Sequence, residues 1–133
     1  MNDVIVKDEV VIENLIYEVR GKQVMLDSDL ARLYEVETKQ LNRQVKRNIE
    51  RFDDDFMFQL TDSEYQNLKC QIGTSSSNNY GGRRTLPYVF TEMGVITLVS
   101  VLHSTIAINM SKKIIRAFVM MRHYISSNLM EKI

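Results

Sequence analysis

The chain has 133 residues, of which 44% are apolar and 26% charged, and its formal net charge is zero. This length suits one domain with its own core, and the composition is typical of a soluble globular protein. The single cysteine, Cys70, excludes an internal disulfide, and the longest dense apolar run is too short to cross a bilayer. From the length we expect one domain over residues 1–133. Because no basic and then apolar leader begins the chain, we expect a cytoplasmic location.

The charges are segregated along the chain. Residues 1–38 carry 4 basic and 9 acidic groups, whereas residues 39–51 carry 5 basic groups and 1 acidic group. Residues 52–82 are acidic again, with 1 basic and 5 acidic groups, and residues 83–133 carry 7 basic and 2 acidic groups. A protein that docks one face on phosphate needs such an arrangement, but small proteins also show charge blocks by chance.

The chain is expected to begin with an arm and a hairpin. Residues 1–14 are acidic and polar with scattered valines, and we interpret them as a mobile arm or a short edge strand. The β-prone runs 15–19 and 24–26 flank a turn that contains Gly21, which tolerates positive φ. This pattern predicts a β-hairpin.

Two helices are predicted next. Asp27 and Ser28 are candidate N-caps for a short helix over 29–34. After a break of three residues, Thr38 is the candidate N-cap of a longer helix over 39–51. The spacing of helix, break and helix is that of a helix-turn-helix.

Extended segments and a further helix follow. A buried strand is predicted over 56–60, and Thr61 with Glu64 forms a capping box that starts a helix. Residues 73–84 are rich in Ser, Asn and Gly and predict a flexible loop. Extended structure is expected again over 86–90.

Two long helices complete the predicted fold. Thr91 is the candidate N-cap of a helix that ends near Leu102, and this helix is apolar nearly all round, which predicts a place at the centre of the domain. Gly94 is expected to let a neighbour approach closely. Ser104 is the candidate N-cap of a last helix over 105–125. The predicted fold class is α+β, a helix-turn-helix with a small antiparallel sheet or hairpin and two long C-terminal helices.

The predicted helix over 39–51 separates apolar from basic residues. At 100° per residue, one narrow stripe contains Leu41, Val45, Ile49 and Phe52. The opposite side presents Lys39, Gln40, Arg43, Lys46 and Arg47. A basic face on the second helix of a helix-turn-helix predicts entry into the major groove of DNA. The alternative is an ordinary solvated basic face.

The side chains on this helix match the hydrogen-bonding groups of DNA. Lys39 and Arg43 are candidates to donate to guanine O6 and N7, and Gln40 or Asn42 to bridge adenine N6 and N7. The candidates for phosphate contacts are Lys46, Arg47 and Arg51.

Two other basic elements accompany this helix. Arg83 and Arg84 follow two glycines and are candidates for phosphate or minor-groove contacts, although a surface loop with incidental charge explains them equally well. The last helix carries a further basic face with Lys112, Lys113, Arg116 and His123. For this face an ordinary solvated surface is the favoured interpretation.

Three segments resemble, in the family's order, the phage ORF-six N-terminal domain family, which is related to the KilA-N and Bro-N domains: ENLIYEVRGKQVMLDSDLARLYEVETKQLNRQVKRNIERF, FMFQLT and GGRRTLPYVFTEMGV. The similarity covers residues 13–122. It implies a DNA-binding domain of phage and prophage, often part of regulator-like or antirepressor-like proteins. The family's basic helix maps onto 38–51, which adds Thr38 to the DNA-binding candidates, and its glycine–arginine motif maps onto 81–84.

No arrangement of residues predicts catalysis. The adjacent aspartates 53–55 indicate a solvated turn, since a nuclease metal site needs carboxylates that converge from separate elements. Ser100 and His103 lie one helical turn apart, but no carboxylate is placed to orient the histidine. Cys70 lacks partners at zinc-ligand spacing, and no glycine fingerprint for phosphate is present. We expect no enzyme activity, metal, cofactor or small-molecule substrate.

The sequence therefore predicts sequence-directed binding of double-stranded DNA, in transcriptional or phage and prophage regulation. The alternative is an antirepressor-type protein-interaction module that uses the acidic blocks 1–38 and 52–82. A homodimer is a further candidate assembly, because the last helix has a wide apolar arc, although a central buried helix explains the arc equally well. This arc contains Ile106, Ile108, Ile114, Ile115, Phe118 and Met121.

Overall fold

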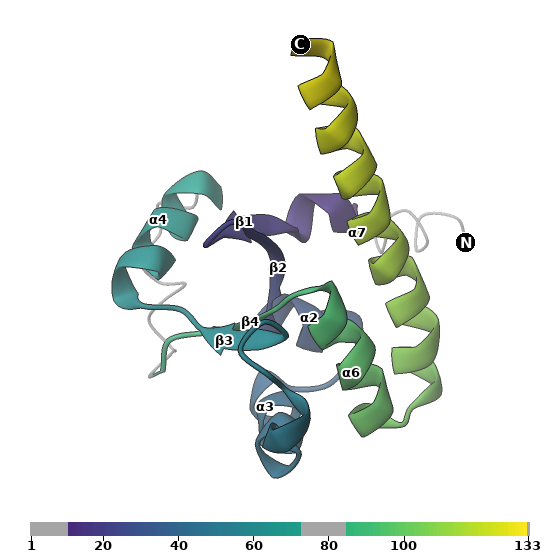
Figure 1. Cartoon of the computed structure of the whole chain (residues 1–133). Helices are drawn as coiled ribbons and strands as arrows, with labels where there is room; N and C mark the ends of the chain where they lie inside the picture. Colours follow the sequence, from purple (N-terminus) through teal and green to yellow (C-terminus); the bar gives the residue numbers. More distant parts are fainter. Residues whose placement is uncertain (1–10, 73–84, 133) are drawn as a thin grey trace, which may run out of the picture.

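The computed structural model describes residues 11–72 and 85–132, with side chains described as far as residue 123. The elements in chain order are η1 (Ile12–Leu15), β1 (Tyr17–Val19), β2 (Lys22–Leu26), α2 (Asp27–Leu33), α3 (Thr38–Arg47), η2 (Ile49–Arg51), β3 (Met57–Gln59), α4 (Asp62–Ile72), β4 (Tyr88–Phe90), α6 (Glu92–Leu102) and α7 (Thr105–Lys132). Figure 1 shows α7 running along one side of the domain and α4 on the opposite side. The fold is α+β, as the sequence predicts.

The strands form an antiparallel sheet in the order β1-β2-β4-β3. Arg20 and Gly21 connect β1 to β2 and both have positive φ, 57° and 75°, as in a type I′ hairpin turn. The predicted hairpin is therefore confirmed, with a tighter turn than expected. β4 begins directly after Pro87 and pairs with β2 on one side and β3 on the other.

The two faces of the sheet carry separate apolar rows. In register across β2, β4 and β3, one row contains Met25, Phe90 and Met57, and the other contains Leu26, Val89 and Phe58. Because successive side chains of a strand point to opposite faces, each row needs its own cover. The helices α2, α3, α6 and α7 cover the first row, and α4 covers the second with Tyr65 and Leu68.

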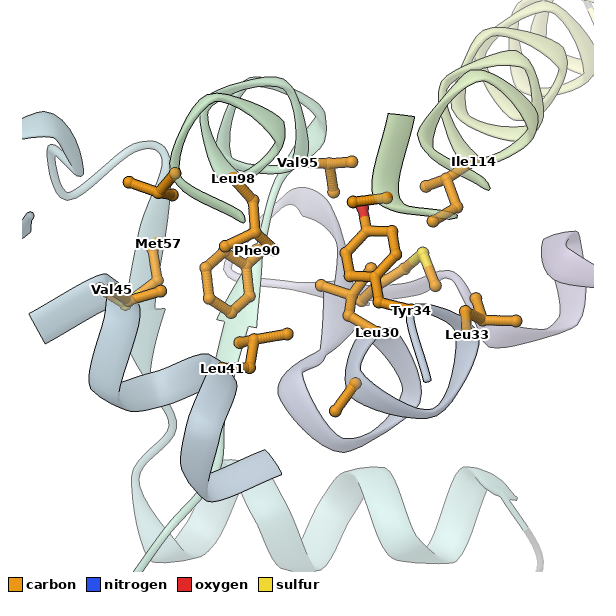
Figure 2. Packing of buried hydrophobic residues seen from close by; sticks show 14 of the residues in the cluster. Leu30, Leu33, Tyr34, Leu41, Val45, Met57, Phe90, Val95, Leu98 and Ile114 are labelled. Atoms are coloured by element: carbon orange, nitrogen blue, oxygen red, sulfur yellow. The ribbon is translucent and has the colours of Figure 1, made fainter. Parts of the chain in front are cut away.

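Phe90 lies at the centre of the larger core. Figure 2 shows Leu41 of α3 and Leu98 of α6 beside its ring, and Ile114 reaching into the same core from α7. A buried hydrogen bond in this core joins the Tyr34 hydroxyl to Ser111 Oγ at 2.6 Å. Burial raises the pKa of Tyr34 to about 12, so the phenol keeps its proton. This bond ties α7 to the end of α2.

The predicted N-cap roles of Asp27, Ser28 and Thr38 are wrong, because these residues lie within the helices. Asp27 is the first residue of α2, and the N-cap is Leu26, which makes no side-chain cap bond; Ser28 is within the helix. Thr38 is likewise the first residue of α3, after Glu37. Asp27 is instead fully buried and bonds to distant parts of the chain, which competes with its use as a cap.

The second helix of the pair is shorter than predicted. α3 ends at Arg47, and residues 49–51 form a separate 3₁₀ turn. The Asn48 side chain donates to the Gln44 carbonyl oxygen at 2.9 Å, and its backbone leaves the helical region at φ −124°. Asparagine competes with the helix in this way because its amide bonds to nearby backbone. Ile49 consequently leaves the predicted apolar stripe and is 52% exposed.

A left-handed residue makes the turn between α2 and α3. Glu35 has φ 61°, and the Val36 amide donates to the Ala31 carbonyl oxygen at 2.9 Å. This is the Schellman arrangement that ends many helices, with glutamate where glycine is usual. Val36 packs against the larger core, and the chain then enters α3, which contacts α2.

The predicted caps of the C-terminal helices are confirmed. The Gly94 amide donates to Thr91 Oγ1 and the Ala107 amide to Ser104 Oγ. A Cβ added to Gly94 would lie 2.1 Å from the Phe56 carbonyl oxygen, so the predicted close approach is also confirmed. The predicted central position of α6 is wrong, since Ile96 is 43% exposed. α7 continues to residue 132, beyond the predicted end.

The first segment differs from the predicted arm or strand where the structure describes it. Residues 12–15 form one 3₁₀ turn, and Ile12 and Leu15 pack against the larger core. Residues 1–10 and the predicted loop 73–84 lie outside the described residues. Within the described ranges, none of the helices has both the length and the apolar character that a membrane span requires.

Candidate nucleic-acid interface

α3 has one buried and one exposed side. Leu41 and Val45 are buried, and Figure 2 shows them pointing from α3 towards Phe90 and Met57. The exposed side carries the residues that periodicity placed there, which are Lys39, Gln40, Arg43, Lys46 and Arg47. The apolar stripe therefore anchors the helix to the sheet and turns its cations to solvent.

The cations of α3 are not neutralised by the part of the protein that the structure describes. The ion pairs there join Arg20 to Glu64, Arg32 to Asp29 and Arg122 to Glu92, and none involves α3. Arg51, just beyond α3, is exposed and donates from Nη1 to Ser100 Oγ at 3.3 Å. An anion that approaches this surface meets cations that form no ion pair with an acidic residue in ranges 11–72 and 85–132.

A groove of about 520 Å³ runs beside α3. Three cations, Lys39, Arg43 and Lys46, belong to its lining, and they occupy successive turns of the helix. The rest of the lining consists of Asn42, Val45, Ile49, Met57, Thr85 and Tyr88. The groove thus combines a cationic wall with apolar and aromatic side chains from η2 and the sheet.

Asn42 makes a directed contact between α3 and the rest of the domain. Its Nδ2 donates to Asp27 Oδ2 at 2.9 Å, and the Tyr88 amide donates to the same oxygen at 3.1 Å. The side-chain oxygen of Asn42, Oδ1, is buried and has no hydrogen-bond partner among the described residues. Sequence reasoning missed this contact, because nothing in the local pattern around Asp27 indicates a partner fifteen residues away.

The other predicted interface residues are only partly brought together. Thr38 is half-buried at the start of α3. Arg83 and Arg84 lie outside the described residues, although Thr85, next to them in sequence, lines the groove. The basic residues of α7 are exposed as expected of a solvated face, namely Lys112, Lys113, Arg116 and His123.

The residues considered for metal or acid–base chemistry do not converge in the described structure. Asp53, Asp54 and Asp55 are all exposed, and no cluster of three potential metal ligands occurs among the residues described. Ser100 donates to the Thr97 carbonyl oxygen at 2.6 Å, and His103 is an exposed left-handed residue that ends α6.

The fold and the surface define a class of protein, an α+β domain that displays an exposed basic helix beside a groove. A comparison with family models matches residues 14–101 to the ORF6N domain. Because the match spans well over half of the 133 residues, the chain belongs to this phage-associated ORF6N domain family, and the predicted resemblance is confirmed. Neither the curated proteins nor the solved structures contain a match to this chain.

Proposed function

We propose that this ORF6N domain binds double-stranded DNA by placing α3 in the major groove, in transcriptional or phage and prophage control. The observation that carries this proposal is the exposed basic side of α3, whose cations form no ion pair with the described part of the protein. A helix of 10 residues is about 15 Å long, which suits the major groove. α2 and the turn at Glu35 support it from behind, in the order of a helix-turn-helix.

The positions on α3 divide the contacts into two kinds. Arg43 lies at the centre of the exposed side, one turn from Lys39, and both can donate to guanine O6 and N7. Lys46, Arg47 and Arg51 follow towards the helix end, where phosphate contacts would fix the register of the protein on the duplex. The groove beside α3 is lined by Lys46 and would leave space for the sugar–phosphate backbone next to it.

Fluorescence titration of labelled duplex across a range of salt concentrations tests the proposal. Each phosphate contact contributes a slope of about −0.9 in log affinity against log salt. Lys46→Ala should reduce the magnitude of the slope by about one unit and weaken all sequences alike. Lys22→Ala removes an equal charge from the exposed first residue of β2 and serves as the matched control, with an unchanged slope. Affinity that is independent of salt, or no binding to any duplex, would contradict the proposal.

Base reading is tested separately. Arg43→Ala should relax the preference for one base pair, with a cost of about 1–3 kcal/mol on the preferred sequence. Competition between duplexes that differ at single positions measures this loss. If Arg43→Ala and Lys46→Ala behave alike, the assignment of base and phosphate roles is wrong.

A second candidate function, contact with another protein as in an antirepressor or a homodimer, has its own observation. Large apolar side chains are exposed on α6 and α7, namely Met93, Ile96, Ile106, Ile108 and Met120. Ile114 and Phe118, from the predicted dimer seam, are instead buried in the chain's own core. This function requires that the protein self-associates or binds a partner, and that Ile108→Lys abolishes the association. Sedimentation equilibrium of the protein and of the variant measures the association.

A further inference from the structure

We propose that Gln40, and not Asn42, is the amide of α3 that reads a base, and that Asn42 is a positioning residue which Asp27 holds in place. The inference rests on the proposed binding of DNA through α3, and it divides two amides that sequence reasoning left equivalent. It depends on the hydrogen bonds of Asp27 and on the exposure of Gln40.

Asp27 joins three elements through one carboxylate oxygen. The side chain is 0% exposed, and Oδ2 accepts from Asn42 Nδ2 at 2.9 Å and from the Tyr88 amide at 3.1 Å. Asp27 begins α2, Asn42 lies midway along α3, and Tyr88 begins β4. Hydrogen bonds to a carboxylate are stronger than neutral ones, more so away from water. This oxygen therefore fixes where α3 lies relative to α2 and the sheet.

The carboxylate also fixes the orientation of the Asn42 amide. If the amide were turned over, its oxygen would face the Asp27 oxygen, and two acceptors would oppose each other without a proton between them. Adenine recognition by an asparagine needs a free donor and a free acceptor side by side. One N–H of Asn42 Nδ2 donates to Asp27, and the Oδ1 acceptor is buried, so Asn42 cannot present a donor and an acceptor together to adenine N6 and N7.

Gln40 has the properties that Asn42 lacks. Its side chain is exposed and forms no hydrogen bond with the described residues. It lies three residues before Arg43, hence on the same exposed side of the helix, and about 200° around the axis from Asn42. Both groups of its amide are free to meet adenine N6 and N7.

The groove depends on the same network. Tyr88 and Asn42 both line the groove beside α3, and Asp27 holds both. Loss of the Asp27 contact would let α3 shift against β4 while its cations stay on the helix. The expected consequence is weaker binding to every duplex, without a change in which bases are preferred.

Selection of bound duplexes from a random pool, followed by titration of the selected duplex, tests the inference. All measurements are made well below the melting temperature of each variant. Gln40→Ala should lose the preference for adenine at one position, keep the preferences elsewhere and melt like the parent protein. Asn42→Leu, which removes the amide at similar volume, should keep every base preference and lose about tenfold or more in affinity for all duplexes.

The Asp27 variants separate positioning from general stabilisation. Asp27→Asn retains an oxygen that can accept from both Asn42 and Tyr88, so its affinity should stay within about threefold of the parent, whereas Asp27→Ala should behave like Asn42→Leu. If Asp27→Ala does not fold, Asn42→Leu tests the same contact with the Tyr88 bond intact. Unchanged affinity of folded Asn42→Leu overturns the positioning role, and loss of an adenine preference in Asn42→Leu but not in Gln40→Ala overturns the assignment of the reader. If the parent protein selects no duplex, the proposed function fails, and this inference fails with it.

Discussion

The two faces of the sheet use positive charge in opposite ways. On the face covered by α4, Arg20 donates to both carboxylate oxygens of Glu64 at 2.7 and 2.9 Å and lies 4.2 Å from the Phe58 ring centroid. On the face covered by α3, Arg43 is exposed and forms no ion pair with the described residues. The same residue type thus stabilises the fold in one place and, among the residues that the structure describes, forms no ion pair in the other, and only its neighbours distinguish the two.

The difference extends to the helix ends. Glu64 is both the acid of the Arg20 ion pair and the second member of the Thr61 capping box, because the Thr61 amide donates to Glu64 Oε1 at 2.8 Å. One carboxylate therefore holds the β1–β2 turn and the start of α4 together. At α3 no side chain caps the first turn, and the apolar stripe and the Asp27 contact hold the helix instead.

The largest expected effect comes from a cavity made in the core between α4 and the sheet, on the face opposite α3. Leu68 is buried on α4 against the second row of the sheet, and Leu68→Ala should lower the free energy of unfolding by about 2–5 kcal/mol. Urea denaturation measures this loss. Because the cavity lies on the far face from α3, the folded variant should bind duplex DNA with unchanged affinity at low temperature. Weaker binding by the fully folded variant would show that the faces are coupled.

A smaller effect is expected from the two arginines. Arg20→Ala removes a bidentate ion pair and a ring contact that are partly exposed, and it should cost about 1 kcal/mol of stability. Arg43→Ala, its matched control, should change stability by less than about 0.5 kcal/mol while lowering DNA affinity. Thermal unfolding of both variants in one buffer compares them, and equal losses of stability would remove the distinction between paired and unpaired charge.

The smallest effect is a dependence of stability on pH. The hydrogen bond from Arg20, followed by that from the Thr61 backbone, lowers the pKa of Glu64 from 4.5 to about 2. A carboxylate with a depressed folded-state pKa stabilises the protein above its unfolded value, so this contribution is complete above about pH 4.5 and is lost as the pH falls towards 2. Glu64→Gln should flatten the acid limb of a stability profile measured by urea denaturation. A variant profile as steep as that of the parent would assign the acid sensitivity to other groups.

Features that depend on neighbouring residues could be predicted from the sequence. The caps at Thr61, Thr91 and Ser104 form as expected because each hydroxyl accepts from a backbone amide three residues later. The hairpin and the buried stripe of Leu41 and Val45 follow equally from turn chemistry and periodicity. These signals also located the exposed basic side of α3.

Features that depend on distant residues could not be predicted. Asp27 has the sequence signature of a cap, but its carboxylate bonds to Asn42 and to the Tyr88 amide, 61 residues away. The apolar composition of α6 predicts burial on all sides, but Ile96 is exposed. Which sides of α6 are covered depends on how the other elements are arranged in space, and local composition does not give that arrangement. The helix breaks at Asn48, where a side-chain hydrogen bond to the backbone competes with continuation of the helix. Helix propensity alone does not predict which of the two forms.

The ORF6N match ends at residue 101, within α6, yet the core does not end there. Ala107, Ile114, Ala117 and Phe118 of α7 are all buried against residues inside the matched range. A recombinant fragment cut at the family boundary would expose one wall of the interior to water and leave the Tyr34 hydroxyl without Ser111. Such a fragment should aggregate or unfold for reasons unrelated to DNA, so binding studies on this chain require α7.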